Sequence, residues 1–399
     1  MKRLLPALSL VALLAAPGLA RAGYTETLPS STFILDSSFV WSKVKTHWND
    51  EGEPGPLLEE VVRYEPGGGW QGTLIPNATA EYDVLVSLLM YGVTDRISVM
   101  AGIPLVLQTS IDPDLGWEVG VHSVQIGRPY SEEDFWAWAG SMDQPKPGPW
   151  TGNKGALSDI VLGARWRFDE LIPPFQDLKL RSAVQIFGAL PTGVAPDPEE
   201  LVAAGTMSWN LNTQGELGFH LAFERELGDR VLVGVDFFHE IFFPHRFYSS
   251  TGAVHPLLLN TRPYVGETYV IDGGDFTGVD VGVEVIAIQG PILDTWLTKK
   301  LKGAGNIPPL VTLTARYNFT YVGQTDYTSN SELWDWEQEK FWKPGYKNIL
   351  LGQVMVSLLR VGVPLRLYAK VRDISLLPGK NVRGPLAVTG GLQLPLRFW

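Results

Sequence analysis

The chain lacks cysteine, long apolar segments beyond its first residues, and any excess of basic side chains. Without cysteine it forms no disulfide bond and no thiolate metal site, so 399 residues must be held together by a large core or a closed sheet. No later run of about 18 apolar residues occurs, which excludes a membrane-spanning helix there. The 43 Asp and Glu outnumber the 32 Lys and Arg, which argues against nucleic acid as a partner.

The N-terminus carries the one apolar run of note. The basic pair Lys2-Arg3 precedes apolar residues from Leu4 to Leu19, and Ala20-Arg21-Ala22 follows. This order is typical of a secretory signal peptide with its cleavage site. We predict that residues 1–22 are removed and that 23–399 form the mature chain. An uncleaved transmembrane helix is the alternative, and the shortness of the apolar run disfavours it.

Short segments in which apolar and polar residues alternate recur along the mature chain. A period of two indicates β-strands, and the charges on one face are informative: Arg165 and Arg167 share the face opposite Trp166. Two arginines inside a soluble β-sandwich are costly, whereas the lumen of a membrane barrel is polar. The predicted strands are 31–45, 79–92, 97–108, 157–168, 177–189, 209–227, 231–243, 276–288, 310–322, 346–359, 364–374 and 386–398.

The fold expected from this pattern is all-β: a transmembrane antiparallel up-and-down β-barrel of about twelve strands, with a large secreted all-β protein as the alternative. Abundant glycine and aromatic residues suit tight turns and the two membrane interfaces. Short connections alternate with long ones, as periplasmic turns and extracellular loops do. The connection 290–308 breaks this order, so it holds a short helix or the count is wrong. The long loops are predicted at 46–77, 110–155, 190–208, 244–275 and 323–344.

The last strand predicts how the barrel closes. Apolar residues occupy every second position up to Phe398, and Trp399 falls one residue out of step. An open apolar edge invites aggregation, so this strand should pair with the first one at Phe33 to Trp41. We expect Phe398 to face lipid, Trp399 to lie at the periplasmic rim, and this strand to be read by the barrel-assembly machinery. Outer-membrane lipid is therefore an expected partner.

Charged residues on the alternate faces are the candidates for a lumen. One interpretation is a salt-bridged interior that makes the barrel rigid; the other is a charged constriction that selects solutes. Arg165, Arg167, Lys179 and Arg181 come from adjacent strands and are predicted to form a basic ladder that attracts anions, with an acidic counterpart further round. The selectivity candidates are Arg165, Arg167, Lys179, Arg181, His220, Glu224, Asp280, Glu284, Arg316, Lys370 and Arg372.

Aromatic residues gather in the loop 110–155. Ser131 with Asp134 three residues later resembles a capping box, which predicts a short helix from there. Its aromatic side chains either line an entry site for an apolar ligand or pin the loop to the barrel rim. The ligand-capture candidates are Trp117, Phe135, Trp136 and Trp138.

Two motifs carry a resemblance to a known family. Tyr91-Gly92-Val93-Thr94-Asp95-Arg96-Ile97 is followed by Gly102-Ile103-Pro104, and Leu157 to Phe168 reads LSDIVLGARWRF. These resemble the outer-membrane transporters of the phenol-degradation meta-pathway family, relatives of the long-chain fatty-acid and aromatic-hydrocarbon channels. The second motif departs at Gly155, one residue early, and at Trp166, where tyrosine is common. The resemblance implies an outer-membrane channel.

The fatty-acid channels carry an N-terminal hatch that plugs the barrel. Only Gly23 to Ser30 precede the first predicted strand here, which we expect to be too short for such a plug. Any obstruction should then come from a loop that folds inward, most plainly 110–155.

The function expected is passive uptake of small hydrophobic or aromatic compounds through a monomeric barrel in the bacterial outer membrane. The alternatives are a narrow pore for polar or anionic solutes, or a structural barrel that interacts through its surface. An enzyme ranks last, because no histidine has an H-x-S or G-x-S-x-G context. No cofactor and no metal site is expected, since the histidine and acidic spacings fit no standard site.

Overall fold

The computed structural model describes residues 24–57, 60–65, 68–141, 146, 148–193, 215–248, 268–302, 307–329, 343–374 and 376–397. The predicted signal peptide, Phe398 and Trp399 lie outside these residues, as do large parts of the predicted loops 190–208, 244–275 and 323–344. The predictions made for them therefore stay predictions.

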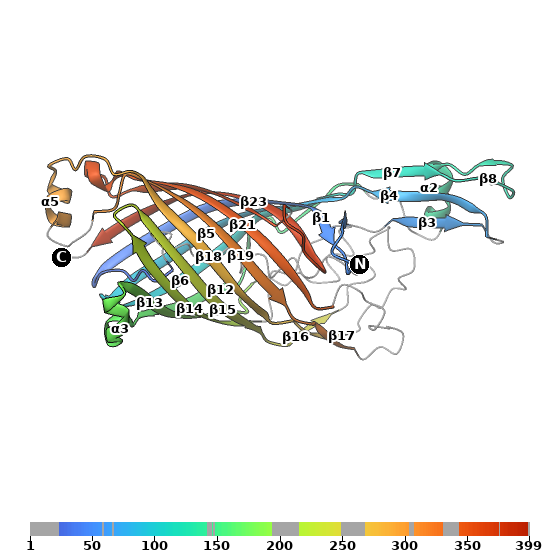
Figure 1. Cartoon of the computed structure of the whole chain (residues 1–399). Coiled ribbons are helices and arrows are strands. Elements are labelled where there is room, and N and C mark those ends of the chain that lie inside the picture. The colour runs from blue at the N-terminus through green and yellow to red at the C-terminus, as the bar shows by residue number, and fades with distance from the viewer. Residues whose placement is uncertain are drawn as a thin grey trace.

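Twelve long antiparallel strands form a closed barrel (Figure 1), so the expected fold and strand count are confirmed. Each strand pairs with the next, and the last pairs with the first. The strands are β1 (Thr32–Trp48), β5 (Thr79–Thr94), β6 (Ile97–Asp112), β12 (Ile160–Arg167), β13 (Leu180–Leu190), β14 (Glu216–Leu227), β15 (Val231–Phe242), β18 (Phe276–Ile288), β19 (Val311–Val322), β21 (Gly345–Ser357), β22 (Arg366–Asp373) and β23 (Val382–Arg397).

The barrel closes through the expected pair of strands. Phe33 lies opposite Leu396 and Trp41 opposite Val388, so β23 runs antiparallel to β1 along most of its length. Val388, Leu392 and Leu396 are 38–45% exposed on the outer face. A sheet closed in this way has no unpaired edge, which is the requirement for strands that cross a bilayer.

An apolar belt covers the outside of the barrel, as bilayer contact requires. Among the helices of the described ranges, none is long and apolar enough to cross a membrane. The outward-facing members of the belt include Phe39, Tyr91, Val99, Ile103, Leu107, Leu162, Trp166, Ile186, Phe219, Leu221, Phe237, Val281, Leu313, Tyr317, Phe319, Val354, Leu367 and Val371.

Short connections gather at the barrel end drawn on the left of Figure 1. The TDR turn joins β5 to β6 as predicted, with the Thr94 hydroxyl accepting from the backbone N–H groups of Arg96 and Ile97. The exceptional connection 290–308 does contain a short helix, which confirms that alternative over a miscounted hairpin. The helical pieces at this end are η2 (Asp169–Leu171), α3 (Pro173–Asp177), α5 (Trp296–Lys302) and η5 (Leu358–Val361).

At the opposite end, the first two long loops form an extension that points away from the barrel (Figure 1). A strand of the first loop, β4 (Trp70–Pro76), pairs with β3 (Val61–Tyr64) and with β7 (Leu115–Val119) of the second loop. The small hairpin β8 (His122–Ser123) and β9 (Arg128–Pro129) follows, then helix α2 (Glu132–Gly140). Because β7 pairs with β4 outside the barrel, the expectation that any obstruction of the lumen would come from loop 110–155 is wrong for the described part of that loop.

The remaining short strands lie along the same barrel end. β2 (Pro54–Pro56) pairs with β1, and β10 (Trp150–Gly152) and β11 (Ala156–Leu157) pair with β6. The strands β16 (His245–Tyr248), β17 (Thr268–Asp272) and β20 (Asp326–Ser329) form a separate small sheet.

Candidate functional site: the barrel lumen

One side of the lumen is apolar. The inward positions of β5, from Ala80 to Met90, are all 6% exposed or less, and they pack against inward residues of β1 and β6. The sequence shows apolar residues on both faces of β5, so the inward face was not readable from the pattern. We call this surface the apolar wall; its members are Ile34, Val40, Val44, Ala80, Tyr82, Val84, Val86, Leu88, Met90, Met100 and Val106.

The other strands, β12 to β22, present charged side chains to the lumen, and we call this surface the charged wall. One pair within it is compensated locally: His220 Nδ1 lies 2.6 Å from Asp236 Oδ2 across β14 and β15. Such pairing is what a rigid polar interior needs. The members are Arg165, Glu216, His220, Glu224, Asp236, Glu240, Asp280, Glu284, Arg316, Lys347, Arg366, Lys370 and Arg372.

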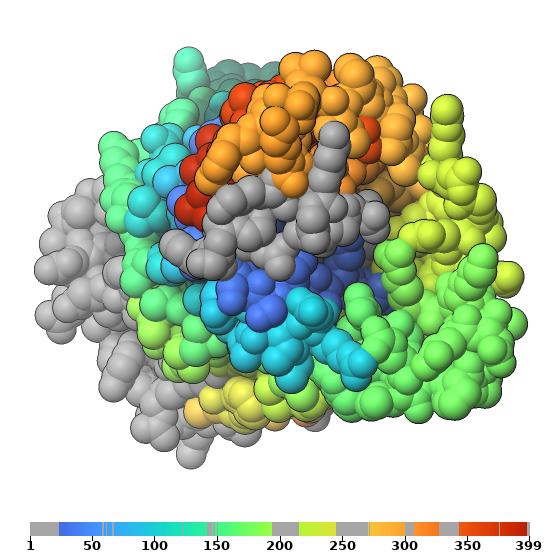
Figure 2. Space-filling view, turned by 90° about the vertical axis from the view of Figure 1, so that its left-hand side faces the viewer, coloured from blue at the N-terminus to red at the C-terminus, as the bar shows by residue number. Residues whose placement is uncertain are grey.

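The N-terminal segment, residues 24–31, lies between the two walls. Tyr24 and Thr25 donate their backbone N–H groups to the Glu224 carboxylate, at 3.2 Å for Thr25, and the Thr25 hydroxyl donates to the same group. Further along, the Leu28 N–H donates to Ser98 Oγ at 2.7 Å. Figure 2 looks onto the end with α3 and α5, where blue residues from the start of the described chain lie in the middle of the ring.

Our expectation that Gly23 to Ser30 are too short to obstruct the barrel is therefore wrong. Eight residues span at most about 26 Å when fully extended, and this segment is long enough to contact β6 through Leu28 and β14 through Tyr24. It needs no fold of its own, because the walls supply its partners. The TDR turn fixes its outer end: the Ser30 N–H donates to the Asp95 carboxylate and the Thr27 hydroxyl to the Asp95 carbonyl oxygen, each at 2.8 Å.

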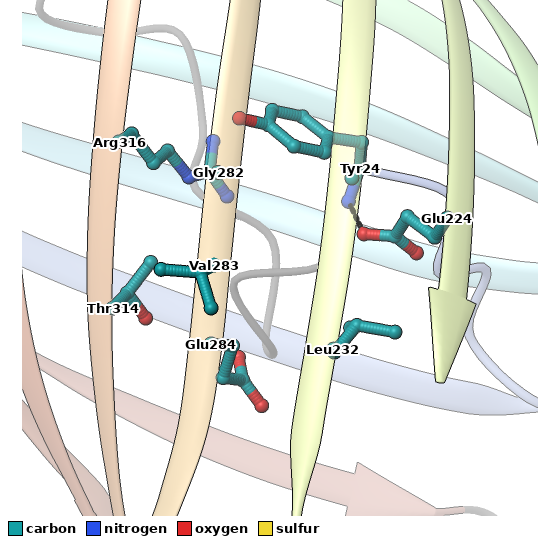
Figure 3. Close-up of a pocket in the computed structure, with 9 residues that line it drawn as sticks. Tyr24, Glu224, Leu232, Gly282, Val283, Glu284, Thr314 and Arg316 are labelled. Atoms are coloured by element: carbon teal, nitrogen blue, oxygen red, sulfur yellow. Dashed lines mark hydrogen bonds between the residues drawn. The ribbon is translucent and has the colours of Figure 1, made fainter. Parts of the chain in front are cut away.

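The segment bridges the two walls with different chemistry. Leu28 is buried among Ile34, Leu88, Met90 and Met100 of the apolar wall. Tyr24, four residues earlier, lies on the charged wall (Figure 3), where its hydroxyl donates to Asp280. A cavity of about 10 Å³ beside it, lined in part by Glu284 and Arg316, has room for about one water molecule.

The four cations of the predicted basic ladder are not brought together. Only Arg165 lies in the lumen, where its Nε donates to Gln185 Oε1 at 3.0 Å and its Nη1 to the Glu26 carbonyl oxygen at 3.2 Å. The other three are near the end that carries α3. There Arg167 pairs with Asp169 and Glu170, Arg181 pairs with Glu226, and Lys179 is exposed in the turn before β13. A strand pattern gives the face of a residue but not its height in the barrel.

The remaining selectivity candidates line the charged wall, and three of them have a role that the sequence did not suggest. Glu224 and Asp280 bind the N-terminal segment, and the Arg316 guanidinium lies over the Tyr24 ring, 4.2 Å from its centroid. His220, Glu284, Lys370 and Arg372 keep the predicted inward position. The residues missed were Tyr24, Thr25, and Gly234 and Gly282 beneath the Tyr24 ring, because their importance comes from a contact between distant parts of the chain.

The four loop aromatics lie on β7 and α2, in the extension beyond the barrel end (Figure 1). The Phe135 ring centroid lies 5.2 Å from that of Trp117, 4.9 Å from Trp136 and 5.7 Å from Trp138. Phe135 and Leu74 are fully buried. These contacts form a small core between α2 and the sheet, so the rings contact each other; ligand capture by them stays a prediction.

Helix α2 begins as predicted. Ser131 Oγ accepts from the Asp134 N–H at 3.2 Å, and the Ser131 N–H donates to Asp134 Oδ2 at 2.8 Å, which is the reciprocal capping box. Asp134 also accepts hydrogen bonds of 2.6 and 2.7 Å from the Arg128 guanidinium. The cap is thus tied to the β9 strand by a bidentate pair.

Acid should loosen this cap. The Arg128 guanidinium, with the Ser131 N–H, holds the pKa of Asp134 below its ordinary value. A carboxyl with a lowered folded pKa stabilises the fold fully above its unfolded pKa of about 3.9, and that stabilisation is lost as the pH falls through the folded value. We expect the NMR chemical shift of the Asp134 carboxyl carbon to titrate with a midpoint below about 3.9, the pKa of an unfolded aspartate. Arg128→Gln should move this midpoint upward. A midpoint unchanged by Arg128→Gln would contradict this.

Comparison with known proteins places the fold. The chain resembles an outer membrane channel from Pseudomonas putida F1, with a TM-score of 0.55, 11% identity, and coverage of 94% of this chain and 98% of that one. The translocator domain of the autotransporter NalP from Neisseria meningitidis gives 0.38 at 8% identity, covering 100% and 99%. A mutant of the TodX monoaromatic hydrocarbon channel gives 0.35 at 11%, covering 94% and 91%. No protein-family model and no curated protein sequence matches.

Proposed function

We propose that this barrel is a passive outer-membrane channel for small hydrophobic or aromatic compounds, closed in this conformation by its N-terminal segment. The observation that carries the proposal is the apolar wall, with Leu28 buried against it. A lumen for polar solutes alone has no use for a continuous apolar surface, because such a surface offers them no hydrogen bonds. Membership of the phenol-degradation family, indicated by the TDR and LSDIVLGARWRF motifs, is part of the proposal.

The contact between Leu28 and the apolar wall suggests how an apolar solute would pass through the barrel. An apolar solute that replaces this side chain buries its surface against the same residues and gains about 25 cal/mol per Å². On the charged wall opposite, His220 pairs with Asp236, and a solute that follows the apolar wall need not desolvate the charged side chains. Transport then needs only displacement of the segment and a concentration gradient, with no energy source.

The charged wall supports one competing function, a narrow pore for polar or anionic solutes. Arg165 is the basic residue of the predicted ladder that lies in the lumen, and it is bound to Gln185 and to Glu26. An anion would have to compete with both partners. We therefore rank this function second. A monomeric state, and assembly through Phe398 and Trp399, complete the proposal.

A substitution on the apolar wall tests the channel. Val86→Glu places a carboxylate on the wall, and because an unpaired buried charge costs several kcal/mol we expect toluene uptake into proteoliposomes to fall at least roughly tenfold. Val86→Thr keeps the shape and adds one hydroxyl, so it should give a smaller loss. Val124→Glu, at an 85% exposed position in the extension, is the matched control and should leave uptake unchanged.

Two controls separate a loss of the apolar route from misfolding and from a pore for polar solutes. Heat-modifiable migration on a gel verifies that each variant forms a barrel. Toluene uptake by Val86→Glu equal to that of the Val124→Glu control would contradict an apolar route. A wild-type protein that passes chloride readily but no toluene would instead favour the polar pore.

A further inference from the structure

The Tyr24 side chain occupies a site that the barrel wall builds around its ring. We call this the aromatic site; its four residues are Gly234 on β15, Asp280 and Gly282 on β18, and Arg316 on β19. Figure 3 shows the ring lying across these strands, with Arg316 beside it and Glu224 holding the Tyr24 backbone. The physiological role inferred for this site rests on the proposed channel function, whereas its binding chemistry is inferred from these contacts alone.

Two glycines make a flat floor for the ring. Gly234 and Gly282 lie directly opposite each other in the β15–β18 register. A Cβ on Gly234 would come within 2.6 Å of Tyr24 Cδ2, and one on Gly282 within 2.7 Å of the Tyr24 hydroxyl oxygen. Neither glycine is among those with a positive φ, so the backbone does not require glycine at either position. A glycine within a strand weakens it and often marks a place where a ligand approaches closely.

The polar partners of the ring are specific as well. Asp280 accepts a hydrogen bond from the Tyr24 hydroxyl, and the Arg316 guanidinium carbon lies 4.2 Å from the ring centroid, at cation–π distance. A flat floor, a cation over the ring and an acceptor at its rim together select a planar aromatic group that carries a hydrogen-bond donor. None of these features depends on the ring belonging to this chain.

We propose that the aromatic site binds solutes of this class, and that Tyr24 occupies it in cis as a tethered competitor. The tether is short: the Tyr24 and Thr25 backbones are bound to Glu224, which keeps the ring at its site. A solute must displace Tyr24, so its apparent dissociation constant is its intrinsic value divided by the fraction of time that the site is vacant. Loss of the Tyr24 ring from the site withdraws one of the contacts that hold the N-terminal segment.

Chemical complementation of a truncated side chain tests this. Tyr24→Gly in the full-length barrel vacates the site while leaving Glu224 and the rest of the segment in place. The probe is 4-methylphenol, which reproduces the tyrosine side chain, and binding is measured by calorimetry in nanodiscs. We expect saturable binding at one site per barrel, at least tenfold tighter than to the wild type, and weakened at least tenfold for toluene, which has the same shape without the donor.

Two further variants locate the binding, each made in the Tyr24→Gly background. Gly282→Val fills the floor and Asp280→Leu removes the acceptor; each should abolish the gain in affinity, and heat-modifiable migration verifies that both still form barrels. Equal binding to wild type and Tyr24→Gly, or binding that survives Gly282→Val, overturns the aromatic site. The channel proposal is judged separately by wild-type toluene uptake, so either can fail without the other.

Discussion

Replacing Glu224 by alanine should open the barrel. The Glu224 carboxylate accepts hydrogen bonds from the Tyr24 N–H, the Thr25 N–H and the Thr25 hydroxyl, and it is buried. Hydrogen bonds to a charged group contribute about 1.5–3 kcal/mol each. Even a net loss of about 3 kcal/mol shifts the ratio of docked to undocked segment roughly a hundredfold toward the undocked state. Planar-bilayer recordings should show a correspondingly larger open fraction.

The same strand supplies a matched control. Glu226 is two residues further along β14 and pairs with Arg181 at the barrel end, without a contact to the segment. Glu226→Ala should therefore keep the wild-type open fraction, and Glu224→Gln, which retains one acceptor oxygen, should fall between the two. If Glu224→Ala and Glu226→Ala behave alike, the segment is held by its other contacts, among them Leu28 on the apolar wall.

Much of the fold is readable from the sequence because the bilayer allows few solutions. A spanning sheet must close on itself and present an apolar outer face, and both conditions leave a period of two in most strands, with β5, apolar on both faces, as an exception. The closing strand illustrates this: its outward face and its pairing with β1 follow from which residues are apolar. The sequence leaves the short helix in 290–308 as one of two alternatives, because a long connection at that barrel end departs from the usual pattern.

The lumen was less readable because its contacts are long-range. The hydrogen bonds from Tyr24 to Glu224 and to Asp280 join residues 200 and 256 positions apart, and the N-terminal segment has no periodic pattern of its own. The sequence also does not show how far along the barrel axis a residue lies. It therefore groups Arg167 and Arg181 with Arg165, although the first two lie near the rim. The local signal at Ser131, by contrast, was sufficient, because a capping box is closed within four residues.

Truncation of one aromatic ring should unfold the extension while leaving the barrel intact. Phe135 is 0% exposed and lies between Trp117, Trp136 and Trp138, above Leu74 of the sheet. Phe135→Ala removes the centre of this core and should cost about 3–5 kcal/mol, which a three-stranded sheet with one helix cannot absorb. Limited proteolysis should then cut the extension at concentrations of protease that leave the wild type whole.

Val124→Ala, at an 85% exposed position of the same extension, is the control and should keep wild-type resistance. The comparison also decides what the aromatic cluster does. If Phe135→Ala exposes the extension to protease yet leaves toluene uptake unchanged, the rings are a structural core and capture occurs elsewhere. If uptake falls in Phe135→Ala while the extension stays resistant, the rings act on the solute directly and the structural account of the cluster is wrong.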